Sequence, residues 1–371
     1  MLRMPDRRAQ CLALVAFGAL GALAFGALPS CKSSQDVETS SYFDRSISPI
    51  LQHSCSRQTT GCHIANAHGD AVGNLDTTTF DTFDRRHDLL VTYGPYSAPG
   101  LLTKVSGPQT LTVSTLAGNI AITTDIRHAA GSGIDVTSEG YAALKRWMDS
   151  GATKENVGQP TAHLVPTGDC KRVIPADPGF DAKADQTALD EFRTNVQPVL
   201  RKSCSAASCH GNDVADLSLT CGDDDAQVRW NAYIAAQFLS GSPEGSELLR
   251  RPLDPSRGGV FHEGGVVFSD PNDDGYKAML AWAKNRGAAK VDTSDPAFVF
   301  FANRVQPEMV RKGCMFLGCH SPQMFHDLRL RGGSGGQFSI VATRRNYAMS
   351  KLMLSLESPD PNVSRLINKN L

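Results

Sequence analysis

Three short stretches of the sequence place a histidine directly after the second of two cysteines. They are "CSRQTTGCH" (55–63), "CSAASCH" (204–210) and "CMFLGCH" (314–320). Two thiols beside an imidazole can attach a haem, close a disulfide loop or bind a metal ion. The spacers hold six, four and four residues, whereas the common haem-attachment motif holds two. The stretches alone therefore leave all three chemistries open.

The three stretches occupy the same place in an internal repeat. Each follows a related segment, "YFDRSISPILQHSC" from Tyr42, "EFRTNVQPVLRKSC" from Glu191 and "FFANRVQPEMVRKGC" from Phe300. In each segment a β-branched residue comes four positions after an aromatic one, and a proline comes six after it. This apolar spacing predicts a helix, and the proline is expected to end or kink it near its middle.

Two of the repeats also share an ending. Each ending contains a histidine before a glycine-bearing triplet, a later tyrosine, and a tryptophan six beyond the tyrosine: His128, Tyr141 and Trp147; His262, Tyr276 and Trp282. The tyrosine and tryptophan fall within an amphipathic pattern with helix-capping residues at both ends. We expect each module to begin and end with a helix, the two packing together. The third repeat reaches residue 371 before the matching histidine, and we expect the sequence to be incomplete there.

The repeat defines a mainly α-helical chain of tandem modules, the third truncated. The predicted boundaries are a signal peptide 1–31, a polar tether 32–41, module 1 at 42–153, a linker 154–185, module 2 at 186–289 and partial module 3 at 297–371.

The N-terminus is typical of an export signal. Three arginines precede the apolar run 11–28. "LPSC" at 28–31 resembles a bacterial lipobox, which implies lipidation of Cys31, and Lys32 implies outer-membrane sorting. Ordinary signal cleavage and an uncleaved anchor are the alternatives. Because thiols do not stay reduced outside the cytoplasm, the eight cysteines besides Cys11 and Cys31 need disulfides, thioether-bound haem or metal.

If the modules carry haem, the iron needs a second axial ligand opposite the proximal His63, His210 or His320. No methionine lies between His63 or His210 and the closing helix of its module. His128 and His262 occupy matching places there, which predicts two histidine ligands per iron. In module 3 the candidates are Met324, Met349, Met353 and His326.

Together, the opening helix, the Cys-His triad and the closing tyrosine–tryptophan helix resemble class I c-type cytochromes. In particular they resemble planctomycete-type cytochrome c modules and related lipoprotein cytochromes of myxobacteria. The resemblance covers nearly all of 42–371 and departs from the family in the long spacers and the absent methionine. It implies two to three haem c groups on Cys55, Cys62, Cys204, Cys209, Cys314 and Cys319. It also implies electron transfer at the envelope with a redox partner protein, and a lipid anchor in the membrane.

Two other interpretations compete. Each cysteine pair could close a disulfide loop in an envelope scaffold or binding lipoprotein without haem. Cys204, Cys209, His210 and His262 form a set that zinc would accept, although adjacent Cys-His is awkward for a small tetrahedral ion. Cys170 and Cys221 lie outside the triads, and we expect a disulfide between them.

The remaining composition narrows the function classes. A net charge of -1 gives no basic footprint, so nucleic acid is not expected as a partner. No pattern of paired carboxylates or of an activated nucleophile stands out, which favours an electron carrier over an enzyme.

Overall fold

The computed structural model describes residues 40–56, 62–126, 128, 131, 133–156, 165–177, 179–182 and 189–368. The expected signal peptide, Cys31 and all of the tether except its last two residues lie outside this part of the chain. Residues 41–371 belong to one structural unit. Among the described residues, no helix is long and apolar enough to cross a membrane.

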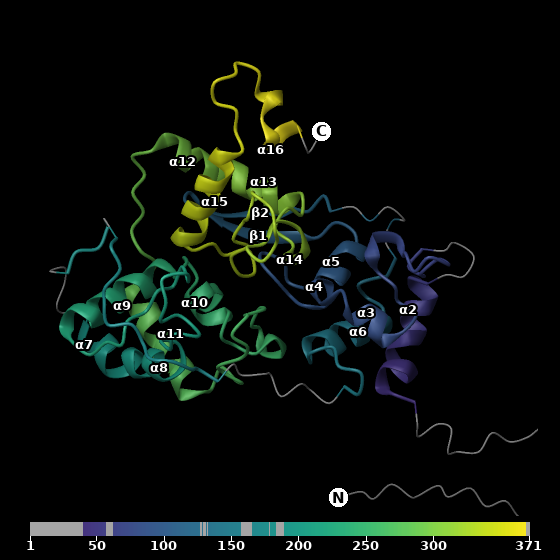
Figure 1. The fold of residues 1–371 in the computed structure, drawn as a ribbon, viewed down its shortest axis with the longest axis horizontal. Helices are drawn as coiled ribbons and strands as arrows, with labels where there is room; N and C mark the ends of the chain where they lie inside the picture. The colour runs from purple at the N-terminus through teal and green to yellow at the C-terminus, as the bar shows by residue number, and fades with distance from the viewer. Residues whose placement is uncertain are drawn as a thin grey trace, which may run out of the picture. The chain divides into compact units, whose positions relative to one another are not determined.

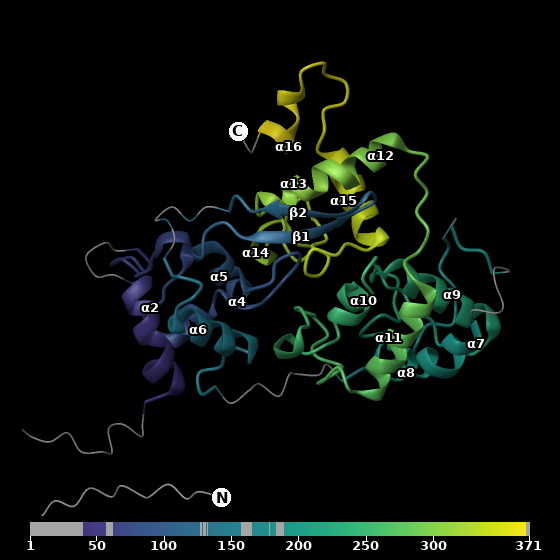
Figure 2. The same cartoon turned by 180° about the vertical axis from the view of Figure 1, so that it is seen from behind.

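The described residues fold mainly into helices (Figures 1 and 2). Module 1 contains η1 (Phe43–Ile47), α2 (Ser48–Ser54), η2 (Val72–Asn74), α3 (Phe80–Asp84), α4 (His87–Leu90), α5 (Gly100–Val105), β1 (Thr110–Thr115), β2 (Gly118–Thr123) and α6 (Glu139–Asp149). Module 2 contains α7 (Leu189–Glu191), η3 (Phe192–Val196), α8 (Gln197–Ser203), α9 (Asp225–Gln237), η4 (Pro243–Gly245), α10 (Glu247–Arg250), η5 (Pro255–Arg257) and α11 (Asp274–Arg286). Module 3 contains α12 (Pro296–Phe300), η6 (Phe301–Val305), α13 (Gln306–Arg311), α14 (Leu317–His320), α15 (Ile340–Leu352), η7 (Pro361–Val363) and α16 (Arg365–Asn368).

The opening helix of each module passes through its proline by way of a π-helical turn. In module 2 the N–H of Gln197 donates to the carbonyl of Phe192, five residues earlier, and Pro198 follows. The same wide turn precedes the proline in modules 1 and 3. Of the two predicted outcomes, the helix does not end at the proline, and it is instead distorted there by the π-helical turn, a feature that bends helices. The proline lies in the first turn of the following α-helical segment, and the wider turn before it accommodates a residue that has no N–H to donate.

Opening and closing helices pack on each other in modules 1 and 2. The ring centroids of Phe43 and Trp147 are 5.7 Å apart, and those of Phe192 and Trp282 are 5.1 Å apart. All four rings are buried at the centre of their modules' hydrophobic cores. The paired aromatic residues thus join the two ends of each module across its middle section.

Modules 2 and 3 share a buried hydrogen-bond network. In module 2, the side chain of Asn231 accepts from the N–H of Thr220 (2.8 Å) and donates to the side chain of Gln197 (2.9 Å) and to the Thr220 carbonyl (3.0 Å). The same three bonds, at 2.6–3.0 Å, link Asn346, Arg331 and Gln306 in module 3. Module 1 has Ser48 in place of the glutamine. Modules 2 and 3 are therefore closer copies of each other than of module 1.

The hairpin formed by β1 and β2 belongs to module 1 by sequence but packs into the core of module 3. Its strands are antiparallel, with Thr110 opposite Thr123. Leu111 and Val113 of β1 lie in one buried cluster with Val310 and its neighbours in module 3, and Figures 1 and 2 show the hairpin beside α13. The modules are thus not independent units, although the repeat by itself would indicate that they are.

The described part of the expected linker 154–185 also departs from the prediction. Cys170 and Cys221, the two cysteines paired in the sequence analysis, form a disulfide. Phe180 packs edge-on against Trp230 with ring centroids 5.2 Å apart. This segment is therefore part of the fold of module 2, not a spacer, because its apolar side chains find buried partners there.

Candidate functional site

The proximal histidines of modules 1 and 2 are held by the end of the opening helix, and all three proximal histidines are held by the extended patch that follows them. In module 2 the N–H of His210 donates to the carbonyl of Cys204 (2.9 Å), and its carbonyl accepts from Leu219 (2.7 Å). The corresponding bonds to the histidine carbonyl come from Thr77 in module 1 and Leu330 in module 3. The repeat therefore presents three histidines in one backbone setting.

The two distal candidates share a tight turn. Nδ1 of His128 donates to the carbonyl of Gly131 (3.0 Å), and Nδ1 of His262 donates to that of Gly265 (2.8 Å). Each glycine N–H returns a bond of 2.9 Å to the histidine carbonyl. The glycines have φ of 78° and 76°, a region that disfavours other residues. This H-x-x-G turn fixes the orientation of both imidazole rings.

The structure brings each proximal histidine of modules 1 and 2 together with its predicted partner. The ring centroids of His63 and His128 are 5.9 Å apart, and those of His210 and His262 are 6.0 Å apart with nearly parallel planes (7°). Bonds between imidazole nitrogen and metal are about 2 Å long, so two imidazoles on opposite sides of one ion have centroids roughly 6 Å apart. The spacing suits a metal held between two rings.

A hydrogen bond at Nδ1 leaves Nε2 of an imidazole available to bind metal. Nδ1 of His63 donates to the carbonyl of Val72 (3.0 Å), a partner arrangement typical of metal-binding histidines. Nδ1 of His210 is buried without a partner at normal hydrogen-bond geometry. The facing carbonyl of Leu217 nevertheless raises the pKa of its imidazole. In the repeat Leu217 corresponds to Leu75 of module 1, whose carbonyl also raises the pKa of His63, and to Leu328 of module 3.

Burial keeps these imidazoles neutral. Desolvation, with a smaller contribution from His262, lowers the pKa of His210 to about 4. Desolvation also lowers the pKa of His63 and of His262. Because the neutral imidazole is the form that binds metal, the histidines are in the protonation state that a ligand needs at neutral pH.

Module 3 is arranged differently. Nδ1 of His320 donates to the carbonyl of Leu328 (3.0 Å), as in module 1. Its neighbour His326 lies edge-on, with ring centroids 4.6 Å apart and planes at 68°, and donates from Nε2 to the carbonyl of Cys319 (2.5 Å). Of the methionine candidates, Met349 lines the cavity of module 2. The structure therefore reproduces the proximal half of the site in module 3 without a facing pair of the kind seen in modules 1 and 2.

A cavity of about 1040 Å³ surrounds the triad of module 2. Cys204, Cys209, His210 and His262 line it together with apolar side chains such as Phe268. Its size is near the upper end for cofactor pockets, roughly 300–1,000 Å³. Two thiols, two facing imidazoles and an apolar wall are the groups that a covalently attached haem requires, so the residues of module 2 fit that group.

The triad cysteines of modules 2 and 3, and Cys55, are thiols that form no disulfide. Burial, with a contribution from the neighbouring cysteine, raises the pKa of Cys204 to about 12 and that of Cys55 to about 11. These thiols are protonated at neutral pH. Among the described residues, no group of three or more His, Cys, Asp or Glu side chains converges to hold a metal ion. This absence does not count against haem, because a haem with two axial histidines takes only two such ligands from the protein.

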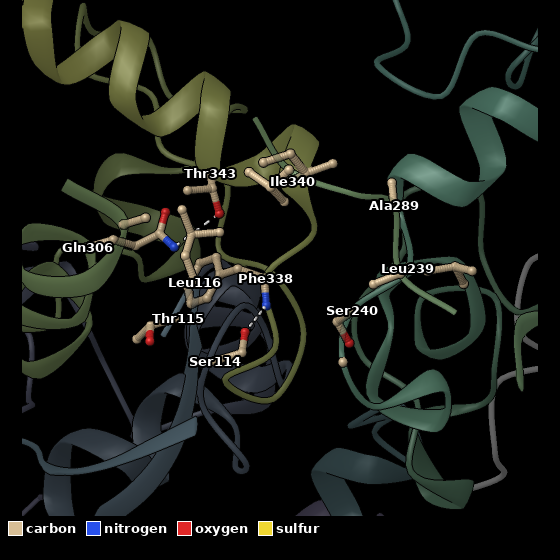
Figure 3. Close-up of a pocket in the computed structure, with 14 residues that line it drawn as sticks. Ser114, Thr115, Leu116, Leu239, Ser240, Ala289, Gln306, Phe338, Ile340 and Thr343 are labelled. Atoms are coloured by element: carbon tan, nitrogen blue, oxygen red, sulfur yellow. Dashed lines mark hydrogen bonds between the residues drawn. The ribbon is translucent and has the colours of Figure 1, made fainter. Parts of the chain in front are cut away.

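A second cavity of about 200 Å³ lies between the β1–β2 hairpin, the segment after α9 and the start of α15 (Figure 3). Gln306 donates to Thr343 beside it, and the N–H of Phe338 donates to Ser114. No lining residue of this cavity carries an ionisable side chain. It offers no group for redox, acid–base or metal chemistry.

Sequence reasoning missed two parts of this site. The carbonyls that orient the proximal rings belong to backbone and carry no residue signature. Arg251 lies close enough to lower the pKa of both His210 and His262 by charge repulsion. Sequence reasoning also missed the asparagine that modules 2 and 3 share, although a comparison of "RWN" (229–231) with "RRN" (344–346) could have revealed it.

No protein-family model matches this chain, and neither a curated protein nor a solved structure matches it significantly. The function proposed for it therefore rests on its own residues and their geometry.

Proposed function

We propose that this chain is a multihaem electron-transfer protein of the bacterial cell envelope, built from tandem cytochrome c-like modules with haem c attached at two or three of its Cys-His triads. The observation that carries the proposal is the pair of facing imidazoles at 6.0 Å in module 2, repeated at 5.9 Å in module 1. In modules 1 and 2 alike, two histidines that are distant in the sequence and stand at matching repeat positions have ring centroids about 6 Å apart.

The chain's own residues supply binding and orientation. Haem bound here supplies one-electron transfer at its iron. The opening helix and extended patch hold His63 and His210, and the H-x-x-G turn holds His128 and His262. Donation from Nδ1 to a backbone carbonyl raises the basicity of the imidazole and fixes its tautomer.

Two histidine ligands and an apolar wall define the expected redox behaviour. Histidine–histidine ligation gives a lower potential than histidine–methionine ligation, which raises it. Apolar side chains in the wall of the module 2 cavity would lower the polarity around a bound haem, which also tunes the potential. We assign no catalytic residue, because the sites present ligands and not an acid–base pair.

The envelope location is part of the proposal. It rests on the export-type N-terminus and on Cys31 as the lipid-modified residue, with the outer membrane as the destination. A redox partner protein would receive or donate the electron.

Haem content is the direct test. The full chain should be produced with the cytochrome c maturation machinery and examined by pyridine haemochrome spectrum and intact mass. We expect a c-type band and two or three haem groups, with one fewer in Cys204→Ala/Cys209→Ala. Absence of the band, with the triad cysteines recovered as disulfides, would support the scaffold alternative instead.

Replacing a distal histidine tests the ligand assignment. His262→Ala and His128→Ala should each convert one haem from low-spin to high-spin, because each removes one axial ligand. His68→Ala, an exposed histidine in a loop of module 1, is the matched control. Low-spin spectra in both distal variants would refute the assignment.

A further inference from the structure

Module 3 contributes part of the wall of the module 2 cavity. The wall carries more cations than anions. Its charged side chains, apart from the triad and its distal histidine, are Lys202, Arg251, Arg329, Arg331 and Arg345 against Asp216, Glu247 and Glu263. Three of the five cations come from module 3. The cavity that encloses His210 and His262 therefore has an excess of two positive charges on its wall.

Two of these arginines share one carboxylate. Nε of Arg331 lies 2.6 Å, and Nε of Arg345 lies 3.1 Å, from the two oxygens of Asp216. The side chain of Asp216 is only 15% exposed, and it belongs to the loop that follows His210. One carboxylate cannot neutralise two guanidinium groups, so this cluster keeps a positive charge at the haem-binding loop.

The repeat does not explain the two arginines. Arg331 stands where module 2 has Thr220, and the shared asparagine network uses only the backbone at that position. Arg345 stands where module 2 has Trp230, which is buried in the core of module 2. At both positions module 3 departs from its closest copy, and both side chains reach Asp216 of module 2.

Arg251, the arginine that module 2 itself contributes to the wall, already has its own partner. Arg251 pairs with Glu247 at 2.9 Å within one helical turn. The carboxylate of Glu247 also accepts from Ser339 of module 3 (2.7 Å). This pair is compensated, whereas the two arginines on Asp216 are not.

We propose that Arg331 and Arg345 bind the propionate carboxylates of the haem in module 2, making this a cofactor site shared between modules 2 and 3. The inference rests on the proposed function. A haem carries two carboxylates, and planar guanidinium groups match carboxylate geometry with paired donors. The wall's excess of two positive charges would balance the two negative charges that the propionates bring.

The test uses the full-length, haem-loaded protein and its reduction potentials. Variants Arg331→Gln, Arg345→Gln and the double variant are titrated by spectroelectrochemistry. The matched control is Arg344→Gln, an exposed neighbour on α15 that does not line the cavity. Because the shared network uses the backbone and not the side chain at position 331, the fold should survive these changes.

We expect one redox component to shift to lower potential, most in the double variant, because loss of a cation near the haem disfavours the more negative reduced state. The resonance Raman propionate bending band should shift in the same variants, which a remote charge would not cause. Arg345→Lys should keep most of the potential and lose the Raman signature.

Three results would overturn the inference. The first is a double variant with wild-type haem content and no shift, and the second is an equal shift in Arg344→Gln. The third is a wild-type protein without c-type haem, which would remove the proposed function as well and is seen before any variant is compared.

Discussion

Modules 1 and 2 reach nearly the same separation of their paired histidines through different connecting segments, although the ring planes meet at 33° in module 1 and at 7° in module 2. In module 2, α10 is followed closely by the distal turn, with the N–H of Val260 donating to the carbonyl of Arg250 (3.0 Å). Module 1 inserts the whole β1–β2 hairpin between α5 and His128, and its cysteine spacer is longer. The ring separations nevertheless differ by only 0.1 Å, 5.9 against 6.0 Å.

The comparison shows which elements place the ligands. The H-x-x-G turn orients the distal ring locally, and the closing helix that follows the turn packs on the opening helix. The loop in between can lengthen because loop closure costs little more as a loop grows. In module 1 the additional length has acquired a second role in the core of module 3.

The largest expected effect follows from disrupting the packing between the opening and closing helices of modules 1 and 2. Trp147→Ala and Trp282→Ala should each destabilise the protein by about 3–5 kcal/mol, because each removes a fully buried aromatic side chain. The two costs should be similar despite the different middle sections. Chemical denaturation, with hydrogen exchange in α2 and α8, measures both.

The tryptophan comparison has an internal control. Phenylalanine at either position keeps most of the buried aromatic area, so Trp282→Phe should cost much less than Trp282→Ala. A large cost in one module and a negligible cost in the other would show that the closing helices are not equivalent.

A smaller and more selective effect is expected from the hairpin. Val113→Ala should cost about 1.5–3 kcal/mol, because Val113 is fully buried against module 3. Hydrogen exchange should increase in α13 and stay unchanged in α2. Ile120→Ala, on the exposed part of the same hairpin, is the control. Faster exchange in α2 instead of α13 would mean that the hairpin supports its own module.

The smallest expected effect concerns the distal turn. Gly131→Ala should cost about 1–2 kcal/mol, because φ of 78° is strained for a residue with a Cβ atom. Gly258→Ala should carry a similar cost, since it has φ of 96° and equally open surroundings.

Only Gly131, whose carbonyl accepts from His128, should alter the proposed haem site. In haem-loaded protein, Gly131→Ala should increase the high-spin fraction, because the carbonyl that orients His128 moves. Gly258→Ala should leave the spectrum unchanged. Equal spectra in the two variants would show that the H-x-x-G turn does not position the ligand.

The sequence predicted those parts of the site that depend on local pattern. The helical spacing around Phe192 and the amphipathic pattern ending in Trp282 both correspond to helices in the structure. The matching positions of His128 and His262 led to the two pairs whose ring centroids lie 5.9 and 6.0 Å apart in the structure. The sequence indicated a disturbance of the helix at the proline, but not its form, because a π-helical turn leaves no mark in residue type.

Other parts were beyond sequence reasoning because they join segments that are distant in the chain. The hairpin has an ordinary strand pattern, and nothing in Leu111 or Val113 indicates that their partners follow almost two hundred residues later. The segment containing Phe180 has the prolines of a linker, yet it packs on Trp230.

By itself the sequence determined the repeat, the three Cys-His triads and the two histidines that match within the modules, because periodicity and spacing are local and copy with the repeat. Only the tertiary structure decided that the histidines face each other at about 6 Å and that module 1 completes the core of module 3. It also decided that Arg331 and Arg345 reach Asp216 of another module. Those outcomes depend on which surfaces are buried together, and burial is a property of the whole folded chain.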